Sequence, residues 1–165
     1  MSAKLIDDAV ERFTADPDTA RSSPSVSASL VDGRARLTTG PYAWEADLPS
    51  ALGGGNRAPG PTAYLLGALA GCAVAFLHDT LAPQLGLTLD AVRAVATCAT
   101  DARGLLGMGD VSPDLNDVTI EIHVTSSASG ELLARLFDLW QERCPVYLAL
   151  VRPVSVRATF ATQSA

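Results

Sequence analysis

The sequence predicts an α+β fold in which antiparallel β-sheet wraps around a long buried helix. The main observation is the stretch from Pro61 to Leu81, which is apolar on nearly every side. A helix that is hydrophobic all round is buried, either in a protein core or in a membrane. The second observation is the order of the elements, βββ–α–ββ–αα–β, in which strand-like runs both precede and follow this helix.

Polar residues in the central helix argue against a membrane span. A span needs at least ~18 consecutive apolar residues, whereas His78 and Asp79 interrupt this run and Pro83 ends it. Pro61 suits the first helical turn, where its missing N–H would be unpaired anyway. One sheet of this size is too small to cover a helix that is apolar on every side. We therefore expect a homodimer in which two chains share the cover, and no contact with a membrane.

The N-terminal part of the chain predicts an appendage followed by a β-meander. Apolar residues recur at helical spacing from Lys4 to Ala15, and residues 16–24 are rich in turn formers. We therefore divide the chain into an N-terminal helical extension with its linker, residues 1–24, and one domain, residues 25–165. That domain opens with three strand-like runs over residues 26–31, 34–39 and 42–47. Asp32-Gly33 is a strong signal for the first hairpin.

The part after the central helix predicts two further strands, two helices and a closing strand. The strands cover residues 87–100 and 118–125, with a loop over residues 101–116, and the second alternates apolar and polar residues. Ser129 is the expected N-cap of a helix that ends near Arg143. Cys144-Pro145 breaks this helix and starts a short one over residues 146–150. A final strand is expected over residues 153–161.

Composition excludes several classes of protein. The net charge is −6 and the 12 lysines and arginines form no basic run, so nucleic acid is not an expected partner. The first residues lack the apolar core of a secretory signal, which predicts a cytoplasmic protein. The three cysteines form no CxxC pair and there are only two histidines, so no metal site is expected.

The cysteines are the residues on which chemistry could depend. Cys72 lies mid-helix between small residues, and its position alone favours a core hydrophobe, because a reactive thiol there would need a nearby cation. His78, six residues later, points away from it. Cys144 precedes Pro145 at a helix start, which favours a thiolate, although it could simply fit a helix break. Cys98, within a strand, is expected to fill the core.

Two motifs carry a family resemblance. LGGGNRAPGPTAYLLGALAGC, together with the later RCPV, resembles the OsmC/Ohr family of organic hydroperoxide reductases over roughly residues 26–161. The resemblance implies an OsmC-like fold, with central helices of an intertwined homodimer wrapped by sheet from both chains. It also implies a thiol peroxidase in which Cys72 attacks an organic hydroperoxide and Cys144 resolves the product as a disulfide. An external dithiol, such as a lipoylated protein, would then reduce it without metal or cofactor.

The chain departs from the family at two positions. The glutamate that should follow the loop's proline is absent, since Thr62 follows Pro61. The arginine that should polarise the reactive thiol is displaced, because its place falls near Val31. The candidates to replace it are Arg34, which we favour, Arg36 and Arg57. These departures support an alternative, an OsmC-fold protein without peroxidase activity that binds a small hydrophobic ligand. A third hypothesis is an interaction module that docks through the N-terminal helix.

Overall fold

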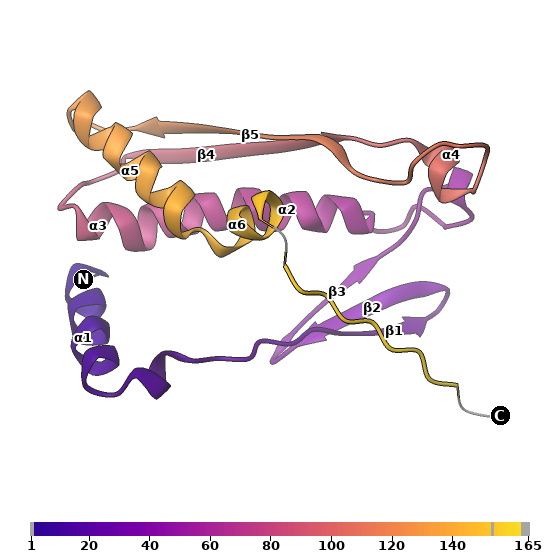
Figure 1. Ribbon diagram of the computed structural model, residues 1–165, viewed down its shortest axis with the longest axis horizontal. Helices are drawn as coiled ribbons and strands as arrows, with labels where there is room; N and C mark the ends of the chain where they lie inside the picture. Colours follow the sequence, from indigo (N-terminus) through magenta and orange to yellow (C-terminus); the bar gives the residue numbers. More distant parts are fainter. Residues whose placement is uncertain (1, 153, 163–165) are drawn as a thin grey trace.

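The chain folds into two antiparallel sheets that lie on opposite sides of one long helix (Figure 1). A computed structural model describes residues 2–152 and 154–162. The elements are α1 (Ser2–Ala15), a 3-10 turn (Pro17–Ala20), β1 (Ser27–Val31), β2 (Arg34–Thr39), β3 (Tyr42–Ala46), a 3-10 turn (Ser50–Leu52), α2 (Pro61–Phe76), a π-helical turn (Leu77–Leu81), α3 (Ala82–Gln84), β4 (Ala91–Ala99), α4 (Ala102–Leu105), β5 (Asn116–Thr125), α5 (Gly130–Arg143) and α6 (Pro145–Val151). Most of the expected elements are therefore confirmed.

The first sheet is the expected meander, in the order β1–β2–β3. Asp32 and Gly33 both have positive φ, at 50° and 75°, as a tight hairpin turn requires. Because side chains alternate across a strand, the register places Leu30 on the same face as Ala35 and Leu37. Across β3, that apolar face continues to Trp44, and the opposite face carries the charged side chains of this sheet.

The second sheet, β4–β5, packs on the central helix and forms the core. Ala94 pairs with Ile122 and Ala96 with Ile120, and these side chains pack against the buried cluster. That cluster joins one face of the central helix to α5, which Ser129 caps by accepting the N–H of Leu132 at 3.3 Å. The buried residues are Leu69, Ala73, Leu77, Leu81, Ala82, Leu89, Leu136, Leu139, Trp140 and Cys144.

The central helix does not end before Pro83, contrary to expectation. It continues to Gln84 by switching to a π-helical turn over Leu77–Leu81. Pro83 has no N–H and its ring collides with the carbonyl four residues earlier. A π turn absorbs this conflict by bonding across five residues, as the N–H of Ala82 does with the carbonyl of Leu77.

The expected burial of this helix is not shown by the single chain. The run Pro61–Gln84 has a mean hydropathy of 1.6 and is long and apolar enough to cross a membrane, yet only 28% of its apolar window is buried. The reason is that β4–β5, α5 and α6 cover one side only. On the other side, small residues recur every four positions and are exposed: Ala63, Gly67, Gly71 and Ala75.

The two ends of the chain extend away from this core. Helix α1 contacts the body near the π turn and α3, and Val10 and Phe13 on its apolar side are exposed. Pro153 lies outside the described residues, and residues 154–161, expected to form a strand, contain no regular structure. A strand needs a neighbouring strand to bond, and these residues find none within the described part of their own chain.

Candidate functional site

The structure brings Cys72 and Cys144 together, as the resemblance implies. Cys72 lies on the covered face of α2, and Cys144 is the N-cap of α6. Pro145 directs this local structure, because it lacks the N–H to continue α5 but suits the first turn of α6. A hydrogen bond joins the Cys72 and Cys144 thiols, with 3.3 Å between the two Sγ atoms. The sulfurs need to approach by only about 1 Å to reach the ~2.05 Å of a disulfide.

An aromatic cluster fixes the position of Cys144. Trp140 stacks on Phe137, with ring centroids 5.7 Å apart, and lies 4.9 Å from the ring of Tyr147. The N–H of Cys144 donates to the carbonyl of Trp140 at 2.8 Å. Cys144 is 0% exposed, whereas Cys72 is half-buried. A reagent from solvent therefore meets Cys72 first.

The single chain keeps Cys72 protonated. Burial, followed by the hydrogen bond with Cys144 and the proximity of that group, raises the pKa of Cys72 to about 11. The backbone N–H of Val146 opposes these effects by stabilising the thiolate. With this pKa, about one thiol in 10⁴ is ionised at pH 7. Val146 was not among the residues predicted from the sequence, although an N–H in the first turn after Cys-Pro is a natural donor to a thiolate.

Arg34 does not reach the cysteines in the single chain. Its Nη1 donates to Oε2 of Glu45 at 2.7 Å, and it lines a separate cavity of about 230 Å³ beside Gly53 and Pro61. Within residues 2–152 and 154–162, no hydrogen bond or ion pair joins Arg34 to a thiol. The favoured arginine therefore lies apart from the dithiol. Glu45 was missed, although the predicted hairpin register places it diagonally across from Arg34.

Asp47 organises the glycine-rich loop. Its buried carboxylate accepts backbone N–H groups from Leu48 at 2.9 Å, Gly55 at 3.2 Å and Arg57 at 3.0 Å. The bond from Arg57, with those from Gly55 and Leu48 and the Arg57 charge, outweighs burial and lowers the pKa of Asp47. A side chain at Gly54 would put its Cβ 2.0 Å from the carbonyl oxygen of Leu48. An aspartate just ahead of three glycines was a signal that sequence analysis passed over.

The remaining arginines and histidine also lie apart from the dithiol. Nη2 of Arg57 donates to the carbonyl of Asp32 at 2.9 Å, which ties the loop to the first hairpin. Arg36 is exposed and forms no ion pair within the described chain. His78 faces solvent, as expected, with Nδ1 2.7 Å from Oδ1 of Asp79.

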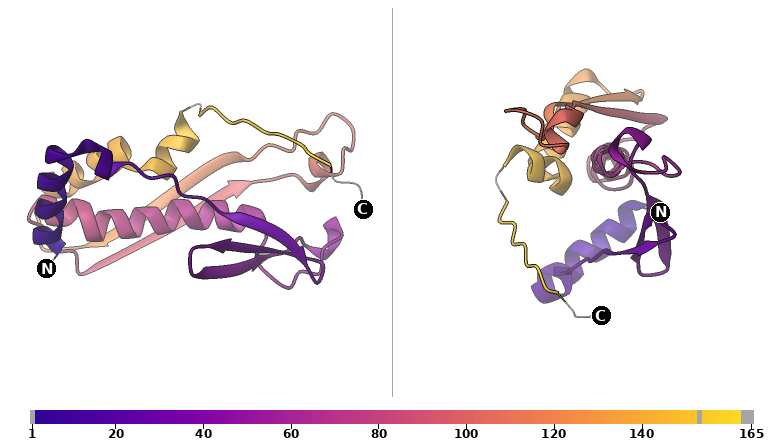
Figure 2. Two further views of the ribbon diagram at one scale, coloured as in Figure 1. Left: turned by 90° about the horizontal axis from the view of Figure 1, so that it is seen from below. Right: turned by 90° about the vertical axis from the view of Figure 1, so that its right-hand side faces the viewer.

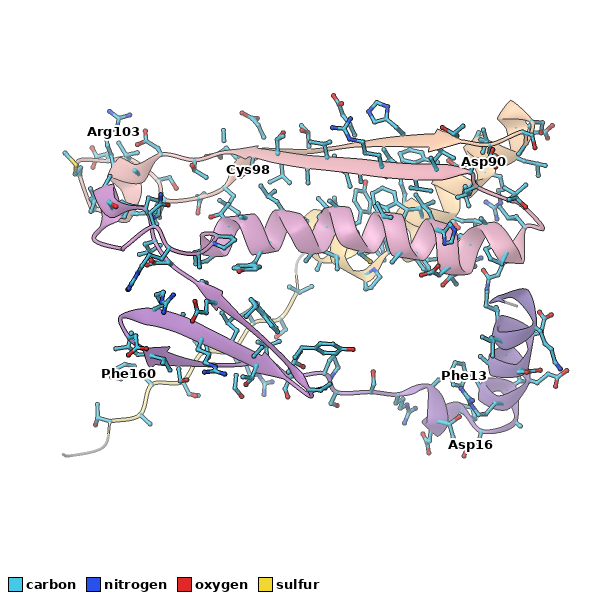
Figure 3. The ribbon with its side chains drawn as sticks, turned by 180° about the vertical axis from the view of Figure 1, so that it is seen from behind. Phe13, Asp16, Asp90, Cys98, Arg103 and Phe160 are labelled. Atoms are coloured by element: carbon cyan, nitrogen blue, oxygen red, sulfur yellow. The ribbon has the colours of Figure 1, made fainter. Side chains whose placement is uncertain are left out.

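Cys98 is not core filler, contrary to expectation. It is half-buried at the irregularity where the β4–β5 register shifts, toward the α4 end of β4 (Figure 3). It lies outside the buried cluster that contains Cys144.

An apolar cavity of about 250 Å³ is lined by residues one helical turn from each thiol, though by neither cysteine itself. Leu69, one helical turn before Cys72, forms one wall, and Tyr147, one turn after Cys144, forms another. The remaining lining residues come from β5, the loop before it and the end of α6: Leu115, Val118, Thr119, Ile120, Leu150 and Val151. The arrangement can hold an apolar group close to two thiols.

Comparison with known proteins agrees with the resemblance seen in the sequence. The chain matches the OsmC-like protein family over residues 53–159, more than half of its 165 residues. No curated protein sequence matches it.

Solved structures share the fold. One is an OsmC-like protein from Mycoplasma pneumoniae, with a TM-score of 0.66, 20% identity and coverage of 79% of this chain and 88% of that one. Another is an organic hydroperoxide resistance protein OsmC from Legionella pneumophila, with a TM-score of 0.59, 18% identity and coverage of 78% and 89%. An OsmC-like protein of unknown function from Vibrio cholerae has a TM-score of 0.60, 11% identity and coverage of 78% and 94%.

Proposed function

Because the chain belongs to the OsmC-like protein family, we propose that it is a thiol-dependent peroxidase that reduces organic hydroperoxides. The observation that carries this proposal is the Cys72–Cys144 pair, with 3.3 Å between its sulfurs. Such a pair is oxidised to a disulfide with little movement, and its half-buried member faces the incoming oxidant. The apolar cavity beside it suits a hydroperoxide with an alkyl group.

The reaction assigns a different role to each cysteine. The Cys72 thiolate attacks one oxygen of the hydroperoxide, the O–O bond breaks, and an alcohol leaves with the thiol's proton. Cys72 is then a sulfenic acid. The Cys144 sulfur attacks Cys72 Sγ, water leaves, and a disulfide forms. An external dithiol reduces this disulfide by exchange and becomes oxidised itself. Buried Cys144 serves as the resolving thiol because oxidant reaches Cys72 first.

A homodimer is part of the proposal. The single chain exposes 11,894 Å², whereas a compact monomer of 17.1 kDa exposes about 7,800 Å². The excess, roughly 4,000 Å² per chain or about 8,000 Å² for two chains, is as large as the most extensive obligate interfaces. The uncovered stripe of α2 and the apolar face of β1–β3 supply this surface. The outward row of β4–β5, with Arg93, Glu121 and His123, is polar and favours a protein partner over lipid.

A second copy would also supply the missing cation. Arg34 of one protomer, placed beside Cys72 of the other, would lower that thiol's pKa by ~1–3 units. Glu45 holds the guanidinium in one orientation, as the absent loop glutamate would have done. Thus Cys72 would be activated only in the assembled protein.

The test is a count of thiols in the reduced protein before and after one equivalent of cumene hydroperoxide. We expect two thiols per chain to be lost and a Cys72–Cys144 peptide to appear in a digest analysed by mass spectrometry. A Cys98→Ser variant is the matched control and should behave identically. Retention of all three thiols would contradict the proposal.

The raised pKa of Cys72 favours one second candidate, binding of a small hydrophobic ligand without peroxidase activity. In that case the 250 Å³ cavity is the binding site and the thiols are packing groups. Native mass spectrometry of the purified protein tests this alternative. A retained apolar ligand together with unreactive thiols would support it, whereas rapid disulfide formation would contradict it.

A further inference from the structure

The cavity beside Arg34 presents a guanidinium edge that no described residue uses. This cavity has a volume of about 230 Å³ and is lined by the start of β2, the end of β3, the glycine-rich loop and the first residue of α2. Nη1 of Arg34 donates to Oε2 of Glu45 at 2.7 Å. Its Nε is buried and has no hydrogen-bond partner in the part of the chain that the structure describes. A buried donor without an acceptor is costly, so a ligand that accepts from Nε would stabilise this arrangement.

The cavity is distinct from the one near the dithiol. Figure 1 and Figure 2 show the β1–β3 sheet toward the N-terminal end of α2, with α1 at the opposite end. The cavity lies where the first hairpin, the glycine-rich loop and the start of α2 meet. None of its described lining residues also lines the 250 Å³ cavity. A ligand here would therefore occupy a second site.

The geometry of the guanidinium indicates the class of ligand. Nε and Nη2 of an arginine lie side by side and form a planar fork that matches the two oxygens of a carboxylate. Glu45 takes the hydrogen bond of Nη1, and Nη2 of Arg34 donates to none of the described residues. The fork that remains is the one that binds a carboxylate side-on.

The surrounding charges favour a monoanion. Glu45 already pairs with Arg34, and Asp47 lines the same cavity, so a dianion such as phosphate would be repelled. The side chain of Asp47 is only 3% exposed, and its oxygens accept N–H groups of the glycine-rich loop at 3.2 and 3.0 Å, which disperses its charge. The start of α2 adds a partial positive charge, because Pro61, its first residue, lines the cavity.

We propose that this cavity binds a small monocarboxylate, such as acetate, held side-on by Nε and Nη2 of Arg34. Ala46 and Leu52 supply apolar walls for its alkyl group. The bound carboxylate would connect the first hairpin to the glycine-rich loop. This site goes beyond the proposed peroxidase activity and needs neither thiol.

The test is an NMR titration of the ¹⁵N-labelled full chain with sodium acetate at pH 7, with sodium chloride added to hold the ionic strength constant. We expect saturable shifts at the amides of residues 33–35 and 46–54, with a Kd of ~1–10 mM, as suits a ligand of so few atoms. Sodium phosphate should give no saturable shift. Amide shifts that do not saturate with acetate would overturn the site.

Two variants test how the carboxylate is held. Arg34→Lys keeps the charge but lacks the planar fork, so it should weaken acetate binding at least ~10-fold. Arg36→Lys, on the same strand, is the matched control and should bind as the wild type does. Ala35→Val narrows the cavity without changing the guanidinium, and should also weaken binding, which keeps the test decisive where Arg34→Lys does not fold. Unchanged affinity in Arg34→Lys or in Ala35→Val would overturn the proposed mode of binding.

The site has one consequence for the thiols, and this consequence alone rests on the proposed function. In the proposed homodimer, a bound carboxylate would compete with the Cys72 thiolate of the second copy for Arg34. Saturating acetate should then slow the alkylation of Cys72 by iodoacetamide at pH 7 roughly 10-fold, which corresponds to a pKa higher by ~1 unit. An unchanged rate with acetate bound would overturn this competition and leave the binding site standing.

Discussion

The dithiol and the arginine–glutamate pair differ in how much of each site one chain completes. Cys72 and Cys144 meet inside a core built by α2, α5 and α6, with aromatic rings behind them. Arg34 and Glu45 meet on a sheet whose apolar face is only partly covered in the single chain, where Leu30 is 82% exposed. The two thiols are thus brought together by folding alone, whereas the cation proposed to activate Cys72 would come from the proposed second copy. The proposed peroxidase activity would therefore require the proposed homodimer.

The largest expected effect separates the three cysteines. Cys72→Ser should reduce hydroperoxide consumption to the background rate, because no other described thiol is both accessible and paired. Cys144→Ser should consume one equivalent and stop as a sulfenic acid, which dimedone traps. Cys98→Ser should be unaffected in a peroxide-consumption assay with a dithiol reductant. Full activity in Cys72→Ser would remove the dithiol from the reaction.

Next in size is the loss of stability when the core behind the dithiol is opened. Trp140→Ala should lower the free energy of unfolding by about 3–5 kcal/mol, because the side chain is fully buried. Urea denaturation followed by circular dichroism measures this change. A loss of unfolding free energy below ~1 kcal/mol would mean that Trp140 is not buried in a core formed by this chain.

Leu30→Ala is the matched substitution on the uncovered sheet. At 82% exposure in the single chain, it would change the free energy of unfolding by no more than ~0.5 kcal/mol if the chain stayed alone. We expect a loss above ~1 kcal/mol in the same urea experiment, because a second copy would bury this side chain. A change within ~0.5 kcal/mol would mean that the apolar face of β1–β3 is exposed to water, and would contradict its proposed burial by a second copy.

The pKa of Cys72 tests whether an arginine of a second copy lies beside this thiol. In the single chain the pKa of Cys72 is raised to about 11, so its alkylation rate by iodoacetamide would climb until about that pH. For the dimer we expect the plateau ~1–3 units lower, and Arg34→Gln should return it toward 11 while Arg36→Gln leaves it in place. A wild-type plateau that already lies at 11 would exclude a cation near the thiol.

The same thiol links stability to alkaline pH. Its pKa in the folded single chain lies above the ordinary value of 9.0, so the unfolded chain loses its proton first. The protonated core thiol therefore contributes stability below pH 9 that declines as the pH rises from 9 toward 11. In the dimer, an arginine beside Cys72 would lower the folded-state pKa of this thiol. The pH range over which its contribution to stability declines would then be narrower.

The smallest expected effect concerns the loop that joins the two regions. Asp47→Asn should loosen residues 53–60, because a neutral amide accepts backbone N–H groups more weakly than a carboxylate. Since the folded-state pKa of Asp47 is lowered, its contribution to stability is present above the unfolded-state value near 3.9 and declines as the pH falls below it. Urea titrations at neutral and acidic pH should thus show a difference between wild type and variant that shrinks in acid. An equal difference at both would contradict the role of the charge.

The sequence by itself determined the local elements and the two cysteines that meet. Apolar spacing, the Asp32-Gly33 turn, the Ser129 cap and the Cys144-Pro145 break each act over a few residues, so the pattern was enough to place them. The motif pair also indicated Cys72 and Cys144. Long-range contacts were not predicted, because the hairpin register and an aspartate ahead of the glycines are weak signals by themselves. Only the folded chain shows that Glu45 pairs with Arg34 and that Asp47 anchors the glycine loop.

Only the tertiary structure shows which other elements pack over each helix and each sheet. An apolar helix pattern states that burial is needed but not which molecule supplies it, so the sequence could not show that α2 is covered on one side only. Nor could the sequence show that the helix continues past Pro83 through a π-helical turn. That continuation depends on packing that holds the helix in place on both sides of the proline. Residues 154–161 do not form the predicted final strand for the same reason. A β-strand needs a neighbouring strand, and the described residues provide no neighbouring strand for this segment.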